Sequence, residues 1–298
     1  MKPDDSSLAS EQFTTVHRSA LDLLNRGAAW GRFPTPVDDL MDAAELQVAP
    51  ISAFDEGSIR RYVREFGQRA EHLLRRALDK VLGVFDVHAD MVHIDPTVTA
   101  GKQTFLKLHE AGHKELPHQR GLYRWIQDGA SFLSPDTAEL FEREANVFAR
   151  LVLFQNDGFI ERTIDEPFGI KVPMNAAKQF GSSLYAGFRE YVRCHHKTCA
   201  AVILEPSVFC PERGFIAQVR RIEPSPGFRR QFGIRSLPNE ITPLHGLGAC
   251  IPIAPQRMSK PQSFALSDLN DEQHEFVGEG FRTPYQTLVL IHAVATPR

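Results

Sequence analysis

Two histidines one helical turn apart, His109 and His113, occur in an H-E-x-x-H pattern with Glu110. Four residues are about 400° of α-helix, so both imidazoles lie on nearly the same face. Imidazole nitrogens are common ligands of a tetrahedral zinc ion. Glu110 projects beside them and is placed to act as general base toward a water activated by the ion. The spacing therefore predicts a hydrolytic zinc site on a helix over 102–114, against the alternative of a surface helix with two unrelated histidines.

A catalytic zinc site needs a third protein ligand, and a second helix, expected over 136–154, offers one. Glu142 and Asn146 are one turn apart on that helix. We expect Glu142 to complete the set of ligands and Asn146 to hydrogen-bond a ligating histidine or its helix. Glu144 lies about 200° from Glu142 around the helix axis, so the two carboxylates cannot bind the same ion.

The segments Phe105–His113 and Glu142–Ala149 together resemble the ImmA/IrrE-type metallo-endopeptidase family. Its signature is a Phe before an H-E-x-G-H helix, then E-x-(E/Q)-A-(N/D)-x-F-A roughly 25–35 residues later. The resemblance extends over 34–205. It implies a zincin-like fold in which Zn²⁺ is held by two histidines and the first glutamate of the second motif, here Glu142. It also implies an endopeptidase of the gluzincin-like type, with a transcriptional repressor as substrate, in a stress or mobile-element response.

Two features depart from the family pattern. The family often has a further histidine after H-E-x-x-H, and His118 is the candidate for that role here. The family also often has a Met-Pro pair after the second motif. Here Gln155 follows that helix without a proline. Neither departure removes a ligand, but the second one changes a helix end near the cleft.

The elements that must position this site indicate an α+β fold, with a mainly helical peptidase-like domain and a small sheet. Helices are expected over 16–26, 37–46, 58–82, 102–114, 136–154 and 175–194, and a strand or hairpin over 84–94. A loop is expected over 121–135 and a linker over 156–173. Short β runs follow at 200–204, 215–222, 249–253 and 287–293. We predict a disordered tail at 1–14, the peptidase-like domain at 15–160, a helical segment at 161–197 and a β-rich domain at 198–298.

Composition excludes some classes of protein. The 298 residues carry 34 Lys and Arg against 37 Asp and Glu, a formal net charge of -3, so any nucleic-acid surface must be local. The arginines of 58–82 are typical of a solvent-exposed helix face, and the alternative is a nucleic-acid-binding surface along that helix. The four cysteines all follow residue 193, which disfavours a disulfide-stapled secreted domain. No apolar run is long enough for a membrane span or a signal peptide, so we expect a cytoplasmic protein.

The helical segment resembles a helix-turn-helix, as some family members join one to the peptidase. Gly181 supplies the turn, and Lys178, Arg189 and Arg193 are the candidate DNA contacts, with a packing module that reads no DNA as the alternative. Cys194, Cys199 and Cys210 form a candidate second metal cluster, or else a loop with half-buried thiols. The β-rich domain suits a sensor or an interaction module. The alternative function for the whole chain is a non-proteolytic DNA- or protein-binding regulator with a structural zinc site.

Overall fold

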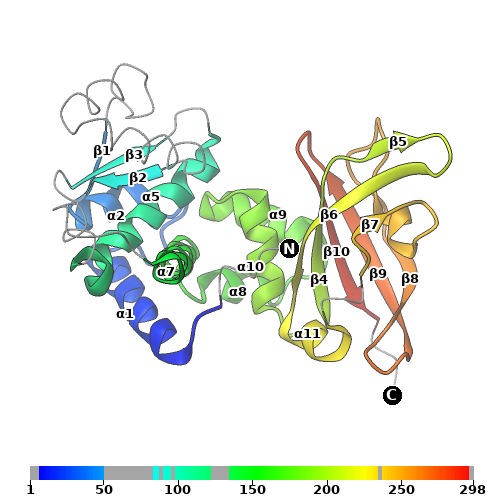
Figure 1. The fold of residues 1–298 in the computed structure, drawn as a ribbon, viewed down its shortest axis with the longest axis horizontal. Helices are drawn as coiled ribbons and strands as arrows, with labels where there is room; N and C mark the ends of the chain where they lie inside the picture. Colours follow the sequence, from blue (N-terminus) through cyan, green and yellow to red (C-terminus); the bar gives the residue numbers. More distant parts are fainter. Residues whose placement is uncertain are drawn as a thin grey trace. The chain divides into compact units, whose positions relative to one another are not determined.

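The computed structural model describes residues 7–49, 83–86, 90–94, 98–121, 134–233 and 237–294. They divide into two compact units. The N-terminal unit comprises residues 2–158 and 179–182, and the C-terminal unit comprises residues 159–178 and 183–298. Helices and sheets both occur along the chain, which confirms the predicted α+β class (Figure 1).

The N-terminal unit is mainly helical and contains a small sheet. Its elements are α1 (Ser10–Arg26), α2 (Val37–Ala43), β1 (Gln47–Val48), β2 (Gly83–Asp86), β3 (Met91–Ile94), α5 (Ala100–Glu115) and α7 (Pro135–Leu153). The strand order is β1-β3-β2, with β1 parallel and β2 antiparallel to β3. The β2–β3 pair confirms the hairpin predicted over 84–94. The helix predicted over 58–82 and most of the loop predicted over 121–135 lie outside the described residues.

The two motif-bearing helices pack against each other in the N-terminal unit. In α5 every residue from Leu108 to Lys114 is buried, and β2 and β3 also pack on this helix. At the start of α7 the Ser134 hydroxyl accepts the N–H of Thr137, and Pro135 occupies the first turn, where its missing N–H is not needed. Both helices therefore begin within two residues of their predicted starts.

The remaining elements, in chain order, make up most of the C-terminal unit. They are α8 (Gly158–Thr163), α9 (Lys171–Phe180), α10 (Leu184–Cys194), β4 (Cys199–Leu204), β5 (Val208–Cys210), β6 (Gly214–Pro224), α11 (Pro226–Phe232), β7 (Glu240–Ile241), the 3-10 helix η1 (Gly246–Cys250), β8 (Gln262–Ser267), β9 (Gln273–Arg282) and β10 (Thr287–Ala293). The sheet runs in the order β5-β6-β4-β10-β9-β8, and β7 pairs with β6.

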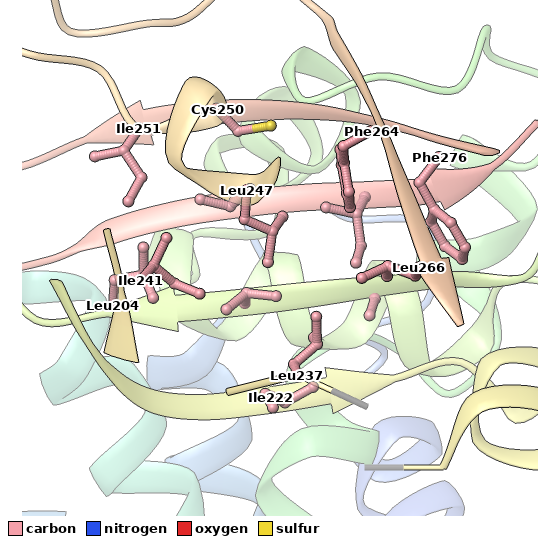
Figure 2. Close-up of a cluster of buried hydrophobic side chains, with 14 of the residues drawn as sticks. Leu204, Ile222, Leu237, Ile241, Leu247, Cys250, Ile251, Phe264, Leu266 and Phe276 are labelled. Atoms are coloured by element: carbon pink, nitrogen blue, oxygen red, sulfur yellow. The ribbon is translucent and has the colours of Figure 1, made fainter. Parts of the chain in front are cut away.

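The central strand β4 is buried along its whole length because both faces of the sheet are covered. Ala200, Val202 and Leu204 join the core cluster drawn in Figure 2, which η1, α11 and the other strands complete. The alternate residues of β4 face the other side of the sheet, against which α10 packs. This burial explains why β4 reads in the sequence as an unbroken apolar run.

Three sequence expectations are wrong in this part of the chain. The linker expected over 156–173 contains α8 and the first turn of α9, where Pro173 is tolerated because early helical N–H groups have no intrahelical partner. The strand expected over 249–253 is instead the end of η1 and the extended residues after it. Strands β8 and β9 were not expected at all.

The missed strand β9 contains two glycines that reduced its β signal. A Cβ atom on Gly280 would lie 2.0 Å from the backbone oxygen of Cys250, and one on Gly278 would lie 2.7 Å from the Cys250 Sγ atom. The strand therefore uses glycine to let η1 lie directly on it, an approach that Figure 2 shows at Cys250. In the described part of the chain, no helix is long and apolar enough to cross a membrane.

Candidate metal centre

The structure brings together the three side chains that the sequence assigns to a metal ion. His109 and His113 on α5 are 8% and 4% exposed, and their Nε2 atoms lie 3.2 Å apart. From α7, the two Glu142 carboxylate oxygens lie 3.3 Å from the His109 Nε2 and 3.6 Å from the His113 Nε2. Two nitrogens from α5 and a carboxylate from α7, at least 29 residues further along the chain, thus lie close together.

This geometry fits a tetrahedral ion. Donor atoms about 2.0–2.2 Å from a tetrahedrally coordinated zinc ion lie about 3.3–3.6 Å from one another. The separation of the two Nε2 atoms, 3.2 Å, is close to this spacing, and Glu142 reaches His109 with its Oε2 at 3.3 Å and His113 with its Oε1 at 3.6 Å. Two histidines and one glutamate are also a donor set that zinc takes in hydrolytic sites. The residues present therefore fit a zinc ion, and His109, His113 and Glu142 are the side chains that would hold it.

The three side chains differ in their exposure to solvent. The Glu142 side chain is 57% exposed, whereas those of His109 and His113 are 10% and 6% exposed. Glu110 is 4% exposed and lies close enough for its charge to raise the pKa of His109. An ion held here would have two buried ligands, a solvent-facing third ligand and a buried carboxylate beside it, which leaves room for a fourth, exchangeable ligand.

The electrostatics of the cluster favour a positive charge between the three side chains. Burial lowers the pKa of His109, but the Glu142 hydrogen bond and the Glu110 and Glu142 charges outweigh it and raise that pKa. Burial also disfavours an ionised Glu142, yet its hydrogen bond with His109 and the two histidine charges bring its pKa down to about 2. Burial and the His109 charge lower the pKa of His113 to about 4.

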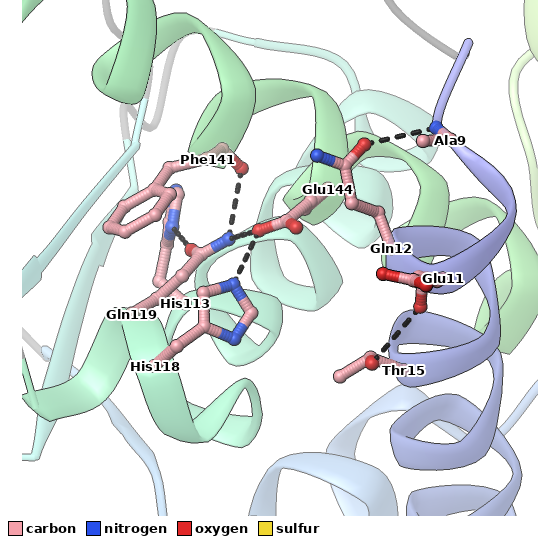
Figure 3. A network of polar contacts seen from close by, with 9 residues as sticks. All are labelled: Ala9, Glu11, Gln12, Thr15, His113, His118, Gln119, Phe141 and Glu144. Carbon is pink, nitrogen blue, oxygen red and sulfur yellow. Dashed lines mark hydrogen bonds and ion pairs between the residues drawn. The ribbon is translucent and has the colours of Figure 1, made fainter.

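Asn146 lies one turn after Glu142, and its side chain is among the groups that raise the pKa of His109. Among the described residues the buried Nδ1 of His109 has no hydrogen-bond partner, so the predicted bond from Asn146 is not formed in this structure. Glu144 points away from the cluster and is 3% exposed. Its Oε2 atom accepts from Gln119 at 2.6 Å and lies 2.6 Å from the His118 Nε2 (Figure 3). His118, the candidate for the extra histidine of the family, thus contacts Glu144 and not the metal-ligating set.

Gln119 is the site residue that sequence reasoning missed. It is fully buried, and its Oε1 atom lies 2.6 Å from the His113 Nδ1. Figure 3 shows it between His113 and Glu144. Gln119 follows His113 by six residues and lies past the end of α5. No helical periodicity therefore connects it to the site, and nothing else in the sequence indicates its role.

Two of the three candidate DNA contacts form ion pairs within the C-terminal unit. The Arg189 Nε lies 2.7 Å from Glu223, and Arg193 lies 3.1 Å from the same carboxylate. Glu223 is 2% exposed on β6, so it holds both arginines of α10 against the sheet. Lys178, on α9, is exposed. The predicted turn is present, since α9 ends at Phe180 and Gly181 has a φ of +72°.

The cysteine cluster does not assemble. The Cys194 thiol hydrogen-bonds Glu190, while Cys199 is buried in β4. In the part of the chain that the structure describes, no cysteine belongs to a group of three metal-ligating side chains. Asp268, Glu272 and His274 do form such a group, at the turn between β8 and β9. There Asp268 already accepts the N–H groups of Asn270 and Glu272 and pairs with His274 at 3.0 Å.

The chain was compared with known families, curated proteins and solved structures. No family model and no curated protein matches it. Among solved structures it is similar to a Mycobacterium tuberculosis transcriptional regulator, with a TM-score of 0.51 and 11% sequence identity. The match covers 95% of this chain and 80% of that chain. At this identity the likeness is one of fold alone.

Proposed function

We propose that this protein is a zinc-dependent endopeptidase that cleaves a regulatory protein, with a transcriptional repressor as the substrate. The observation that carries the proposal is the convergence of His109, His113 and Glu142 at the spacing of a tetrahedral ion, with Glu110 beside them. The choice of substrate rests on the resemblance to the ImmA/IrrE-type family. The name of the structural neighbour, a transcriptional regulator, agrees with a regulatory setting.

A zinc ion at this point would supply a Lewis acid that activates a water molecule and polarises the scissile carbonyl. His109, His113 and Glu142 would hold the ion, and Asn146 would lie beside His109, whose pKa it raises. The Glu110 carboxylate would act as the general base that takes a proton from the attacking water, and as the acid that returns it to the nitrogen of the leaving amine. Burial of Glu110 keeps its carboxylate out of bulk solvent and beside the reacting atoms.

The competing function is a DNA- or protein-binding regulator with a structural zinc site. Structural zinc sites are closed by four protein ligands, whereas the residues that the structure describes supply three here and leave Glu142 exposed. The pairing of Arg189 and Arg193 with Glu223 also occupies two of the candidate DNA contacts. Both observations favour the peptidase.

Elemental analysis tests the metal site. We expect about one zinc per purified chain, and loss of that zinc in His109→Ala and in His113→Ala. The matched control is His17→Ala, because His17 lies on α1 and hydrogen-bonds Asn156 instead. Full zinc occupancy in the His109 or His113 variant would remove that residue from the site, and zinc-free wild-type protein would refute the proposal.

A further inference from the structure

The buried amide of Gln119 has a defined orientation. Its Nε2 atom lies 2.6 Å from the Glu144 Oε2 and 3.3 Å from the backbone oxygen of Phe141. A carboxylate and a carbonyl both accept hydrogen bonds and donate none. The amide nitrogen must therefore face these two oxygens, and the amide oxygen must face the opposite way, toward His113.

This orientation determines which nitrogen of His113 carries the proton. The Gln119 Oε1 lies 2.6 Å from the His113 Nδ1 and can only accept, so the Nδ1 must donate. A neutral imidazole protonated at Nδ1 has its lone pair on Nε2. The Nε2 atom is the one that faces His109 and Glu142.

We propose that Gln119 is a positioning residue that holds His113 in the Nδ1–H tautomer, and that Glu144 sets the orientation of the Gln119 amide. This inference rests on the proposed function, since it assigns the network to the zinc site. His118, which is 41% exposed, closes the chain on the solvent side by pairing with Glu144. Ligating histidines usually donate their second N–H to a partner that fixes ring and tautomer, and loss of such a partner typically costs about 10–100-fold in metal affinity.

Zinc affinity, measured by competition with a chelating dye, tests the role of Gln119. We expect Gln119→Leu to bind zinc about 10–100-fold more weakly than wild type while keeping its fold by circular dichroism. Gln103→Leu is the matched control, because Gln103 lies on the same helix as the histidines but bonds the Val98 carbonyl. Equal zinc affinity in wild type and Gln119→Leu would overturn the inference alone, whereas a wild type that binds no zinc would overturn the zinc site with it.

A variant that exchanges the residue types at 119 and 144 distinguishes the effect of hydrogen-bond direction from the effect of side-chain packing. In Gln119→Glu combined with Glu144→Gln, residue 119 still accepts from the His113 Nδ1 and residue 144 donates to it, so the tautomer is preserved, although the Phe141 carbonyl loses its donor. We expect this variant to recover part of the zinc affinity that Gln119→Leu loses. Failure of the folded double variant to bind zinc more tightly than Gln119→Leu would overturn the inference.

The tautomer itself is measurable in the wild-type protein. Long-range ¹⁵N–¹H correlation spectra of the zinc-free protein report whether the His113 proton lies on Nδ1 or Nε2. We expect Nδ1–H in wild type and a mixed population in Gln119→Leu. An Nε2–H signal for His113 in wild type would overturn the inference without any variant.

Discussion

Gly112 of α5 and Ala145 of α7 bring the two helices into close contact, since a Cβ atom on Gly112 would be 3.2 Å from the Ala145 Cα. The same atom would be 3.1 Å from the Phe148 ring. Only small residues allow this approach, and the approach brings Glu142 of α7 within reach of His109 and His113. The spacing between the ligands is therefore set by a contact that involves none of them.

We predict that Gly112→Ala weakens zinc binding by moving α7, and Glu142 with it, away from the histidines. Overpacking at the contact costs about 1–3 kcal/mol, against about 1 kcal/mol gained in helix propensity, so the free energy of unfolding falls by up to about 2 kcal/mol. Zinc titration and urea unfolding measure the two effects. Gly121→Ala is the control, because a Cβ atom there meets nothing within 4 Å. Unchanged zinc affinity in Gly112→Ala would show that the site does not depend on this contact.

Glu142 and Glu144 differ in the face of α7 that they occupy, which leads to a second prediction. Glu142→Gln removes a zinc ligand and should reduce affinity far more than Glu144→Gln, which only perturbs the network around Gln119. The loss for Glu144→Gln should stay within the roughly 10–100-fold that outer partners contribute. Calorimetric titration with zinc measures both. Equal losses, or the larger loss in Glu144→Gln, would contradict the assignment of Glu142 as the ligand.

The helical period was sufficient to predict which side chains would lie near one another, but not to predict Gln119, which contacts His113. The one-turn spacing of His109 and His113, and of Glu142 and Asn146, follows from 3.6 residues per turn, and the structure brings these side chains together. Gln119 follows the end of α5, and its contact with His113 depends on a tertiary partner, Glu144. Local patterns carry no information about such a contact.

The same reasoning explains the errors in the C-terminal unit. Buried runs such as β4 are apolar enough to be recognised from sequence alone. The strand β9 was missed because Gly278 and Gly280, which normally weaken a strand, are required there by the approach of Cys250. The arginines of α10 were candidate DNA contacts, with a packing role as the alternative, because the sequence does not reveal the buried Glu223 that binds them.

A third prediction concerns His195, which is 2% exposed and packs against Phe168 and Tyr191. Its Nδ1 accepts the N–H of Lys197. Burial and the charges of His196, Lys197 and His292 lower its pKa to about 4. An unfolded histidine has a pKa of about 6.5, so between about pH 6.5 and 4 the unfolded state binds a proton that the folded state does not. The contribution of His195 to the free energy of unfolding therefore falls as the pH drops through this window.

His195→Asn keeps an acceptor for Lys197 and removes the titrating ring, so the decline between pH 6.5 and 4 should become shallower. Urea unfolding at several pH values between 8 and 4 measures it. The variant loses ring packing and should be less stable at pH 8, where the histidine is neutral in both states. His17→Asn, on α1, serves as the control. A slope equal to that of wild type in His195→Asn would contradict the assignment of the pH dependence to this residue.

The central claim is that Glu110 moves a proton during peptide-bond hydrolysis at the zinc site. Glu110→Gln preserves shape and removes the base, so the variant should keep its zinc and its fold and lose about 10²–10⁴-fold in cleavage rate. The direct measurement is co-expression of wild type or Glu110→Gln with a candidate transcriptional repressor from a neighbouring gene and a reporter under the control of that repressor. We expect wild type to cut the repressor and release the reporter, while zinc-loaded Glu110→Gln leaves the repressor intact. Equal relief of repression by Glu110→Gln would contradict the peptidase and favour the binding regulator.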